Sequence, residues 1–214
     1  MAAGFIFDMD GVLTDTVELH YQSWKRLTEE EGIAFTRAQN ETLRGLPRQR
    51  SLEILLGGRA CSPAEFEALM TRKNEYFRVM MEQITPADLL PGVGDFLRSA
   101  AARGMRLGLA SSSRNAREVT QRLGVLHLFD ALEDGYSLLN PKPAPDVFLA
   151  VAERLGLAPQ RCVVFEDAAA GVEAACLGGF WVVGIGPEER VGQAHRVIPG
   201  LSGFSPADFL PPLA

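Results

Sequence analysis

Three aspartates and a glycine follow a short apolar run near the N-terminus. The apolar run at residues 4–7 predicts a buried strand, and the octet DMDGVLTD, residues 8–15, begins where that strand ends. Side chains alternate between the two faces of a strand, so Asp8 and Asp10 are expected to point the same way. Carboxylates that close repel each other unless a cation lies between them or one is protonated, and Mg²⁺ favours carboxylate ligands together with substrate phosphate. The spacing therefore predicts metal-assisted phosphate chemistry, although either aspartate taken alone is also explained as a helix cap.

A run of hydroxyl side chains follows a second apolar stretch. Residues 105–110 predict a strand, and Ser111-Ser112-Ser113-Arg114-Asn115 leads from its end into a helical pattern. The N-terminus of a helix offers free backbone amides, which together with a hydroxyl form a natural seat for phosphate. Simple N-capping of the helix is the alternative explanation for this run.

An acidic pair and a lysine between prolines complete the candidate residues of the second half. Glu166 and Asp167 follow the apolar residues 162–165, where they could complete an oxygen cage around a cation with Asp8. Helix capping is again the alternative. Lys142 stands in PKPAPD, whose prolines stiffen the backbone around it, and its alternative is an ordinary surface lysine.

The elements that carry these residues predict an α/β fold. From Gly104 onward, short apolar runs alternate with helical stretches, and this rhythm is typical of a parallel sheet covered by helices. Residues 15–90 have only helical patterns, among them a capping box at 62–65 that opens a long amphipathic helix. We therefore expect a doubly wound parallel sheet built from residues 1–14 and 91–214, with a helical cap domain, residues 15–90, inserted after the first strand. In such a sheet the ligand lies beyond the carboxyl ends of the strands, which is where the polar segments fall.

Composition narrows the classes of partner. The chain has 214 residues, of which 47% are hydrophobic, and a net charge of −6, which argues against a binder of nucleic acid. No apolar stretch approaches the length of a membrane span and no signal peptide is visible, so we expect a cytoplasmic, monomeric protein whose partner is a small molecule. The cysteines have no CxxC spacing and are interpreted as structural thiols; they are Cys61, Cys162 and Cys176.

The four polar segments, in this order, resemble the signatures of the haloacid dehalogenase superfamily of aspartate-nucleophile phosphotransferases. The resemblance implies that Asp8 attacks phosphorus and that Asp10 acts as acid and base. It also implies that Ser111 and Lys142 hold the phosphoryl group that is transferred. The implied Mg²⁺ ligands are Asp8, Asp10, Glu166 and Asp167.

Three residues of the helical segment stand out for their positions. Lys73 falls in the apolar stripe of the long helix, where a lysine that extends its amine to solvent is the alternative. His20 lies close to the apolar face of the first helix, where an ordinary core histidine is the alternative. Arg48, beside Pro47 in a glycine-proline turn, could grip a phosphate or could be a solvated loop residue.

Within the superfamily, the chain resembles the beta-phosphoglucomutase family over nearly its whole length. The segments that carry the resemblance are DMDGVLTDTVELHYQSWK, LRGLPRQRSLEIL, RKN, LLPG, LASSSRN, KPAPD and EDAAAG. It implies that Thr16, His20 and Lys73 form a network that positions Asp10. The residues implied to bind the sugar phosphate through its non-transferring group are Gly45, Arg48, Ser113 and Asn115.

The implied reaction interconverts beta-D-glucose 1-phosphate and glucose 6-phosphate through an aspartyl-phosphate enzyme and a 1,6-bisphosphate. Two departures concern the sugar: Pro47 replaces a residue with a hydroxyl and an N–H, and Gln49-Arg50 replaces an acidic pair. The rival interpretations are a Mg²⁺-dependent sugar-phosphate phosphatase with the same core, and a non-catalytic sensor of phosphorylated ligands. A sensor would be expected to lack Asp8 or Asp10, and this chain has both.

Overall fold

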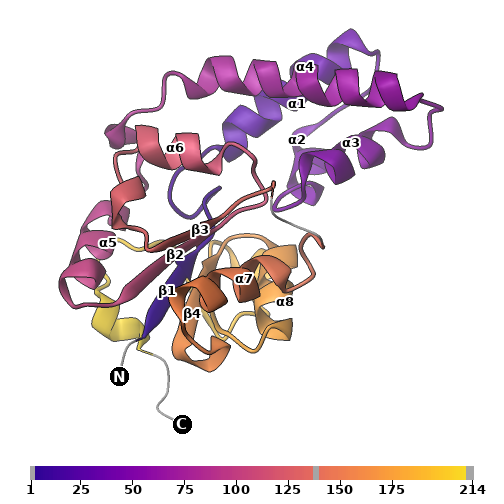
Figure 1. Cartoon of the computed structure of the whole chain (residues 1–214). Helices are drawn as coiled ribbons and strands as arrows, with labels where there is room; N and C mark the ends of the chain where they lie inside the picture. The colour runs from indigo at the N-terminus through magenta and orange to yellow at the C-terminus, as the bar shows by residue number, and fades with distance from the viewer. Residues whose placement is uncertain (1–2, 137–139, 211–214) are drawn as a thin grey trace.

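The structure, a computed structural model, describes residues 3–136 and 140–210. A parallel sheet with strand order β3-β2-β1-β4-β5-β6 forms its centre, which confirms the predicted doubly wound α/β fold (Figure 1). The strands are β1 Gly4–Phe7, β2 Arg106–Ala110, β3 Ala131–Glu133, β4 Cys162–Glu166, β5 Trp181–Ile185 and β6 Arg196–Ile198. β1 lies between β2 and β4, at the point where the strand order reverses, so its carboxyl end opens into the crevice where such sheets bind ligands.

Helices cover both faces of this sheet. α5 Val93–Ala102 and α6 Ala116–Arg122 pack on one face, and α7 Asp146–Leu155 and α8 Ala169–Leu177 pack on the other. The described residues also form α9 Glu188–Val191 and the 3₁₀ helices η1 Pro86–Asp88, η2 Leu126–Leu128, η3 Pro159–Arg161 and η4 Pro206–Phe209. Among the described residues, none of the helices combines the length and the apolar character that crossing a membrane requires.

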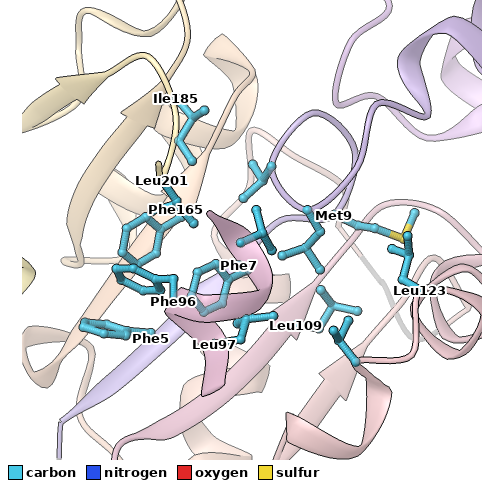
Figure 2. Packing of buried hydrophobic residues seen from close by; sticks show 14 of the residues in the cluster. Phe5, Phe7, Met9, Phe96, Leu97, Leu109, Leu123, Phe165, Ile185 and Leu201 are labelled. Atoms are coloured by element: carbon cyan, nitrogen blue, oxygen red, sulfur yellow. The ribbon is translucent and has the colours of Figure 1, made fainter. Parts of the chain in front are cut away.

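Alternation along β1 assigns its side chains to two cores. Phe5 and Phe7 face α5, where Phe7 stacks on Phe165 with ring centroids 4.8 Å apart and Phe96 packs against both strands (Figure 2). Ile6 points to the opposite face and packs with α7 and α8. Because β1 is buried on both faces, Asp8, which follows it, is held in a fixed position at the edge of the core.

Four helices lie over one end of the sheet, and we call them the cap helices (Figure 1). They are α1 Val17–Glu30, α2 Arg37–Thr42, α3 Arg48–Leu56 and α4 Pro63–Met81. α1 and α4 pack together around Trp24 and Leu27, and the predicted capping box opens α4, where Ser62 and Glu65 each accept a bond from the other's backbone N–H. The two chain segments that join the cap helices to the sheet run side by side, since the Leu90 N–H donates to the Leu13 carbonyl at 2.9 Å.

Candidate active site

A buried lysine joins two carboxylates at the ends of β1 and β4. Lys142 Nζ lies 2.6 Å from Asp8 Oδ1 and 2.8 Å from Glu166 Oε2, and its side chain has no exposed surface. A surface lysine is therefore excluded for Lys142. Although burial alone would lower the pKa of Lys142, the two carboxylates raise it above its usual value, so the amine stays charged.

Three carboxylates meet around this lysine. Asp8, Glu166 and Asp167 are all buried, and each offers an oxygen within 4.8 Å of the other two. Burial raises the pKa of Glu166 to about 8 and that of Asp167 to about 7, against the pull of their cationic neighbours. Such a group of hard oxygens with too little compensating charge fits a divalent cation. Asp10 is not part of this group, and its role as a ligand stays a prediction.

Asp167 is held by the cap helices as well as by the sheet. Arg44, which follows α2, donates from Nη1 to Asp167 Oδ2 and also pairs with Glu41 at 3.1 Å. Arg190 of α9 donates to the Asp167 carbonyl at 2.7 Å. Gly11 makes room for this arrangement: its φ is +78°, and a Cβ there would overlap the Asp167 carboxylate.

Asp10 faces the cap helices instead. The Thr16 hydroxyl donates to Asp10 Oδ1, and His20 Nε2 lies 3.7 Å from the same oxygen. Burial and the Asp8 carboxylate raise the pKa of Asp10 to about 7, which suits a group that must both give and accept a proton near neutrality.

Lys73 contacts the ring nitrogen of His20 that faces away from Asp10. Its Nζ lies 2.9 Å from His20 Nδ1 and 4.9 Å and 5.0 Å from the ring centroids of Trp24 and Phe77. Lys73 is only 2% exposed, so its amine does not extend to solvent. Burial and the nearby Arg48 guanidinium lower the pKa of Lys73 well below its usual range. When the amine donates to Nδ1, the imidazole proton lies on Nε2, the nitrogen that faces Asp10.

The hydroxyl run at the end of β2 folds into a tight turn. Ser111 Oγ accepts from the Ser113 N–H at 3.1 Å, and Ser113 Oγ accepts from the Asn115 N–H at 3.2 Å. None of these side chains caps α6, so simple N-capping does not explain the run. Ser112 instead donates to the carbonyl of Gly45 at 3.0 Å and thereby joins this turn to the cap helices.

A second polar group, centred on Arg48, faces the site from the cap side. Arg48, the first residue of α3, donates from Nη2 to Asn74 Oδ1 at 2.7 Å, and Asn115 Nδ2 donates to the same oxygen at 3.0 Å. Burial and the nearby Arg114 guanidinium lower the pKa of Arg48. No carboxylate among residues 3–136 and 140–210 forms an ion pair with Arg48. Its positive charge therefore remains available to an anion.

One cavity of about 410 Å³ connects the two groups. The predicted residues that line it are Asp8, Asp10, His20, Gly45, Arg48, Lys73, Ser113 and Asp167. The remaining predicted residues are buried beside it and contact lining residues or their neighbours; they are Thr16, Ser111, Asn115, Lys142 and Glu166. The cavity thus has an acidic floor at the sheet, formed by Asp8 and Asp167 with Glu166 beside them, and a basic wall at the cap helices, formed by Arg48.

Comparison with known proteins identifies the family. A profile of haloacid dehalogenase-like hydrolases matches residues 2–178. The chain belongs to this family. It is 43% identical to beta-phosphoglucomutase of Bacillus subtilis over 197 residues, which make up 90% of this chain and 87% of that protein. The crystal structure of a beta-phosphoglucomutase from Clostridium difficile matches with a TM-score of 0.94 at 34% identity and covers 97% of this chain and 95% of that one.

Phosphatases of the same family are also similar to the chain. Fructose-1-phosphate phosphatase YqaB of Escherichia coli is 33% identical over 186 residues, 86% of this chain and 96% of that protein. The chain is therefore an enzyme of the haloacid dehalogenase-like family with close relatives among beta-phosphoglucomutases. The family contains both mutases and phosphatases, so the choice between them depends on the site.

Sequence reasoning assigned no role to several residues that hold the site together. Arg44, Asn74 and Arg190 each connect elements that are distant in the chain. In the sequence, Arg44 and Asn74 are distinguished only by their places within the segments LRGLPRQRSLEIL and RKN. No local pattern indicates which partner such a polar side chain will meet.

Proposed function

We propose that this enzyme is a beta-phosphoglucomutase that interconverts beta-D-glucose 1-phosphate and glucose 6-phosphate. The observation that carries the proposal is the cavity with an acidic floor and, on its opposite wall, Arg48, which forms no ion pair with a carboxylate of the described residues. A mutase must hold two phosphate groups on one sugar, one at the nucleophile and one away from it. The similarity to the Bacillus subtilis and Clostridium difficile mutases supports the same assignment.

In this proposal Asp8 is the nucleophile. Its carboxylate forms a bond to phosphorus while the bond from phosphorus to the sugar oxygen breaks, giving an aspartyl phosphate. Ser111 and Lys142 hold the equatorial oxygens of the transferring group, and the Lys142 ammonium offsets the charge that builds up between Asp8 and the phosphoryl group. Asp10 protonates the departing sugar oxygen and, in the reverse half, removes the proton from the attacking hydroxyl.

The buried carboxylates form the metal site of the proposal. Asp8, Glu166 and Asp167 would hold Mg²⁺, with Asp10 as a further ligand. When bound, the cation neutralises charge on the transferring phosphoryl group. Arg44 and Arg190 orient Asp167 through their hydrogen bonds to its carboxylate and its backbone carbonyl, and these bonds do not depend on a bound cation.

The cap helices supply the second phosphate seat. Arg48, with Ser113, Asn115 and the turn at Gly45, would bind the phosphate that is not transferred. Residues 15–90 act in this proposal as a cap over a core of residues 1–14 and 91–214, and closure of the cap excludes water from the aspartyl phosphate. Thr16, His20 and Lys73 bring Asp10 into position from the same side.

The second candidate is a sugar-phosphate phosphatase, in which water attacks the aspartyl phosphate. The similarity to the Escherichia coli fructose-1-phosphate phosphatase favours it, since every residue of the acidic floor serves both reactions. It differs in needing no second phosphate seat. The position of Arg48 therefore favours the mutase.

Phosphorus NMR tests the proposal directly. Purified enzyme is incubated with beta-D-glucose 1-phosphate, Mg²⁺ and a trace of glucose 1,6-bisphosphate, and glucose 6-phosphate and inorganic phosphate are followed together. The mutase requires glucose 6-phosphate without matching release of phosphate. Phosphate release alone assigns the enzyme as a phosphatase. The Asp8→Asn variant is the control, and undiminished turnover by it would refute the nucleophile.

A further inference from the structure

Asn74 of α4 occupies the junction between the cap helices and the turn after β2. Its side-chain oxygen accepts from Arg48 Nη2 at 2.7 Å and from Asn115 Nδ2 at 3.0 Å. Arg48 begins α3, and Asn115 immediately precedes α6. One amide oxygen therefore holds together the two side chains that would bind the non-transferring phosphate, one from the cap helices and one from the turn after β2.

The chemical type of this acceptor matters. A carboxylate is the usual partner of a half-buried guanidinium, because it compensates the charge and can accept two parallel bonds. At position 74 the acceptor is a neutral amide, and no described carboxylate pairs with Arg48. Burial and Arg114 already act against the charged form of Arg48. The guanidinium is thus oriented without being neutralised.

We propose that Asn74 is a positioning residue that assembles the second phosphate seat when the cap helices meet the core, and that it must be neutral to do so. The proposal rests on the function proposed above. Its amide aims Arg48 and Asn115 at one point and leaves the full charge of Arg48 for a phosphate dianion. Closure of the cap and completion of the seat are consequently one event.

A simple structural bridge would behave differently. Asp has the shape of Asn and keeps an acceptor oxygen for both donors, so a bridge whose only task is to join α4 to the core would tolerate Asn74→Asp. The same change would strengthen the contact with Arg48 through an ion pair. For a phosphate seat, in contrast, Asn74→Asp neutralises the guanidinium and adds a negative charge close to the incoming dianion.

The test compares Asn74→Asp and Asn74→Ser with the unmodified enzyme in two measurements. Calorimetry gives the affinity for glucose 6-phosphate, and steady-state kinetics give KM and kcat for beta-D-glucose 1-phosphate. Gln83→Glu is the matched control, because Gln83 is exposed beyond the end of α4 and its change alters the net charge equally. Hydrolysis of para-nitrophenyl phosphate reports on the acidic floor alone, since this substrate carries no second anion.

We expect Asn74→Asp to weaken glucose 6-phosphate binding and to raise KM by about tenfold to a hundredfold, with a smaller change in kcat, as for a like charge placed beside a bound anion. Asn74→Ser, which is neutral but too short for both bonds, should lose less. Gln83→Glu should match the unmodified enzyme, and the activity of all variants toward para-nitrophenyl phosphate should stay within about twofold, because the added charge lies outside the acidic floor. Melting temperatures of the variants establish that each is folded.

Two results overturn the inference. One is an affinity of Asn74→Asp within about twofold of the unmodified enzyme, and the other is a larger loss for Asn74→Ser than for Asn74→Asp, since both follow from a purely structural bridge. The proposed function fails separately, when the unmodified enzyme forms no glucose 6-phosphate. A loss of affinity in Asn74→Asp would support the seat even then, and unchanged affinity with active mutase would reject only the role of Asn74.

Discussion

The buried Lys142 gives the sharpest prediction about the acidic floor. Lys142 contacts Asp8 and Glu166 at 2.6 Å and 2.8 Å, and its side chain is inaccessible to water. Replacement by methionine keeps an unbranched chain but leaves both carboxylates without their cation. Removing one partner of a buried ion pair costs about 3–5 kcal/mol. At roughly 2–4 °C per kcal/mol for a chain of this size, Lys142→Met should lower the melting temperature of the metal-free protein by about 6–20 °C.

The assay is thermal unfolding in the presence of a chelator at pH 8. This pH matters because protonation of a carboxylate can relieve the loss, and burial already raises the pKa of Glu166 to about 8. At pH 6 the decrease in melting temperature should therefore be smaller. Addition of Mg²⁺ at pH 8 should stabilise Lys142→Met more than the unmodified protein, because the cation supplies positive charge where the ammonium is missing.

Lys25→Met is the matched control. Lys25 is a half-exposed lysine of α1 whose Nζ lies 3.7 Å from Glu29 Oε1, and loss of such a surface pair costs about 0–1 kcal/mol. If Lys142→Met lowers the melting temperature no more than Lys25→Met does at pH 8, the charge balance derived for the acidic floor is wrong. A decrease that is larger at pH 6 than at pH 8 would refute the sign of the argument.

Three further predictions concern the same cavity. Because the pKa values of Glu166 and Asp167 are raised to about 8 and about 7, these two groups bind more protons in the folded metal-free protein than in the unfolded chain between about pH 4 and pH 8. Their contribution to stability should therefore fall over this range, so the melting temperature of Glu166→Gln should fall less between pH 5 and pH 8 than that of the unmodified protein, and an equal or larger fall in thermal scans would contradict this. Lys73→Met removes the contact to His20 Nδ1, so the acid–base step loses a group that orients Asp10 through His20. We expect kcat to fall by about tenfold or more with little change in KM, and steady-state kinetics with unchanged kcat would refute that role. Gly11→Ala places a methyl group against the Asp167 carboxylate at a φ of +78°. The displaced carboxylate should weaken Mg²⁺ binding about tenfold in calorimetry, and unchanged affinity would show that the close contact between Gly11 and Asp167 is unimportant for the metal site.

Features that depend on neighbouring residues could be predicted from the sequence. The apolar run at the N-terminus forms β1, and Asp8 emerges at its end, because burial on both faces favours such a run as a strand. The acidic pair after β4 meets Asp8 for the same reason, since the carboxyl ends of adjacent parallel strands share one edge. Lys73 interrupts an apolar stripe, which marked its position as unusual but left open whether its amine extends to solvent, and the structure shows it buried.

Features that depend on residues distant in the chain could not be predicted from the sequence. β3 and β6 have three residues each, too few for a period of two to stand out, and only pairing with β2 and β5 makes them strands. The contact between Arg44 and Asp167 spans 123 positions, and an arginine in a polar loop gives no sign of which carboxylate it will reach. Asn74 follows a buried lysine and looks like any polar residue at the edge of an apolar stripe.

The contacts between the cap helices and the core explain why closure and catalysis are expected to be linked. Arg44 reaches Asp167 on the acidic side of the cavity, and Asn74 reaches Asn115 on the basic side. Both contacts use groups that also handle the charges of the proposed ligands, so a cation or a phosphate changes the same interactions that hold the cap in place. Binding free energy from the non-transferring phosphate can then stabilise the closed arrangement, in which water is excluded from Asp8. Water, which carries no such phosphate, cannot stabilise closure in this way, and on this argument the sugar hydroxyl is favoured over water as the acceptor.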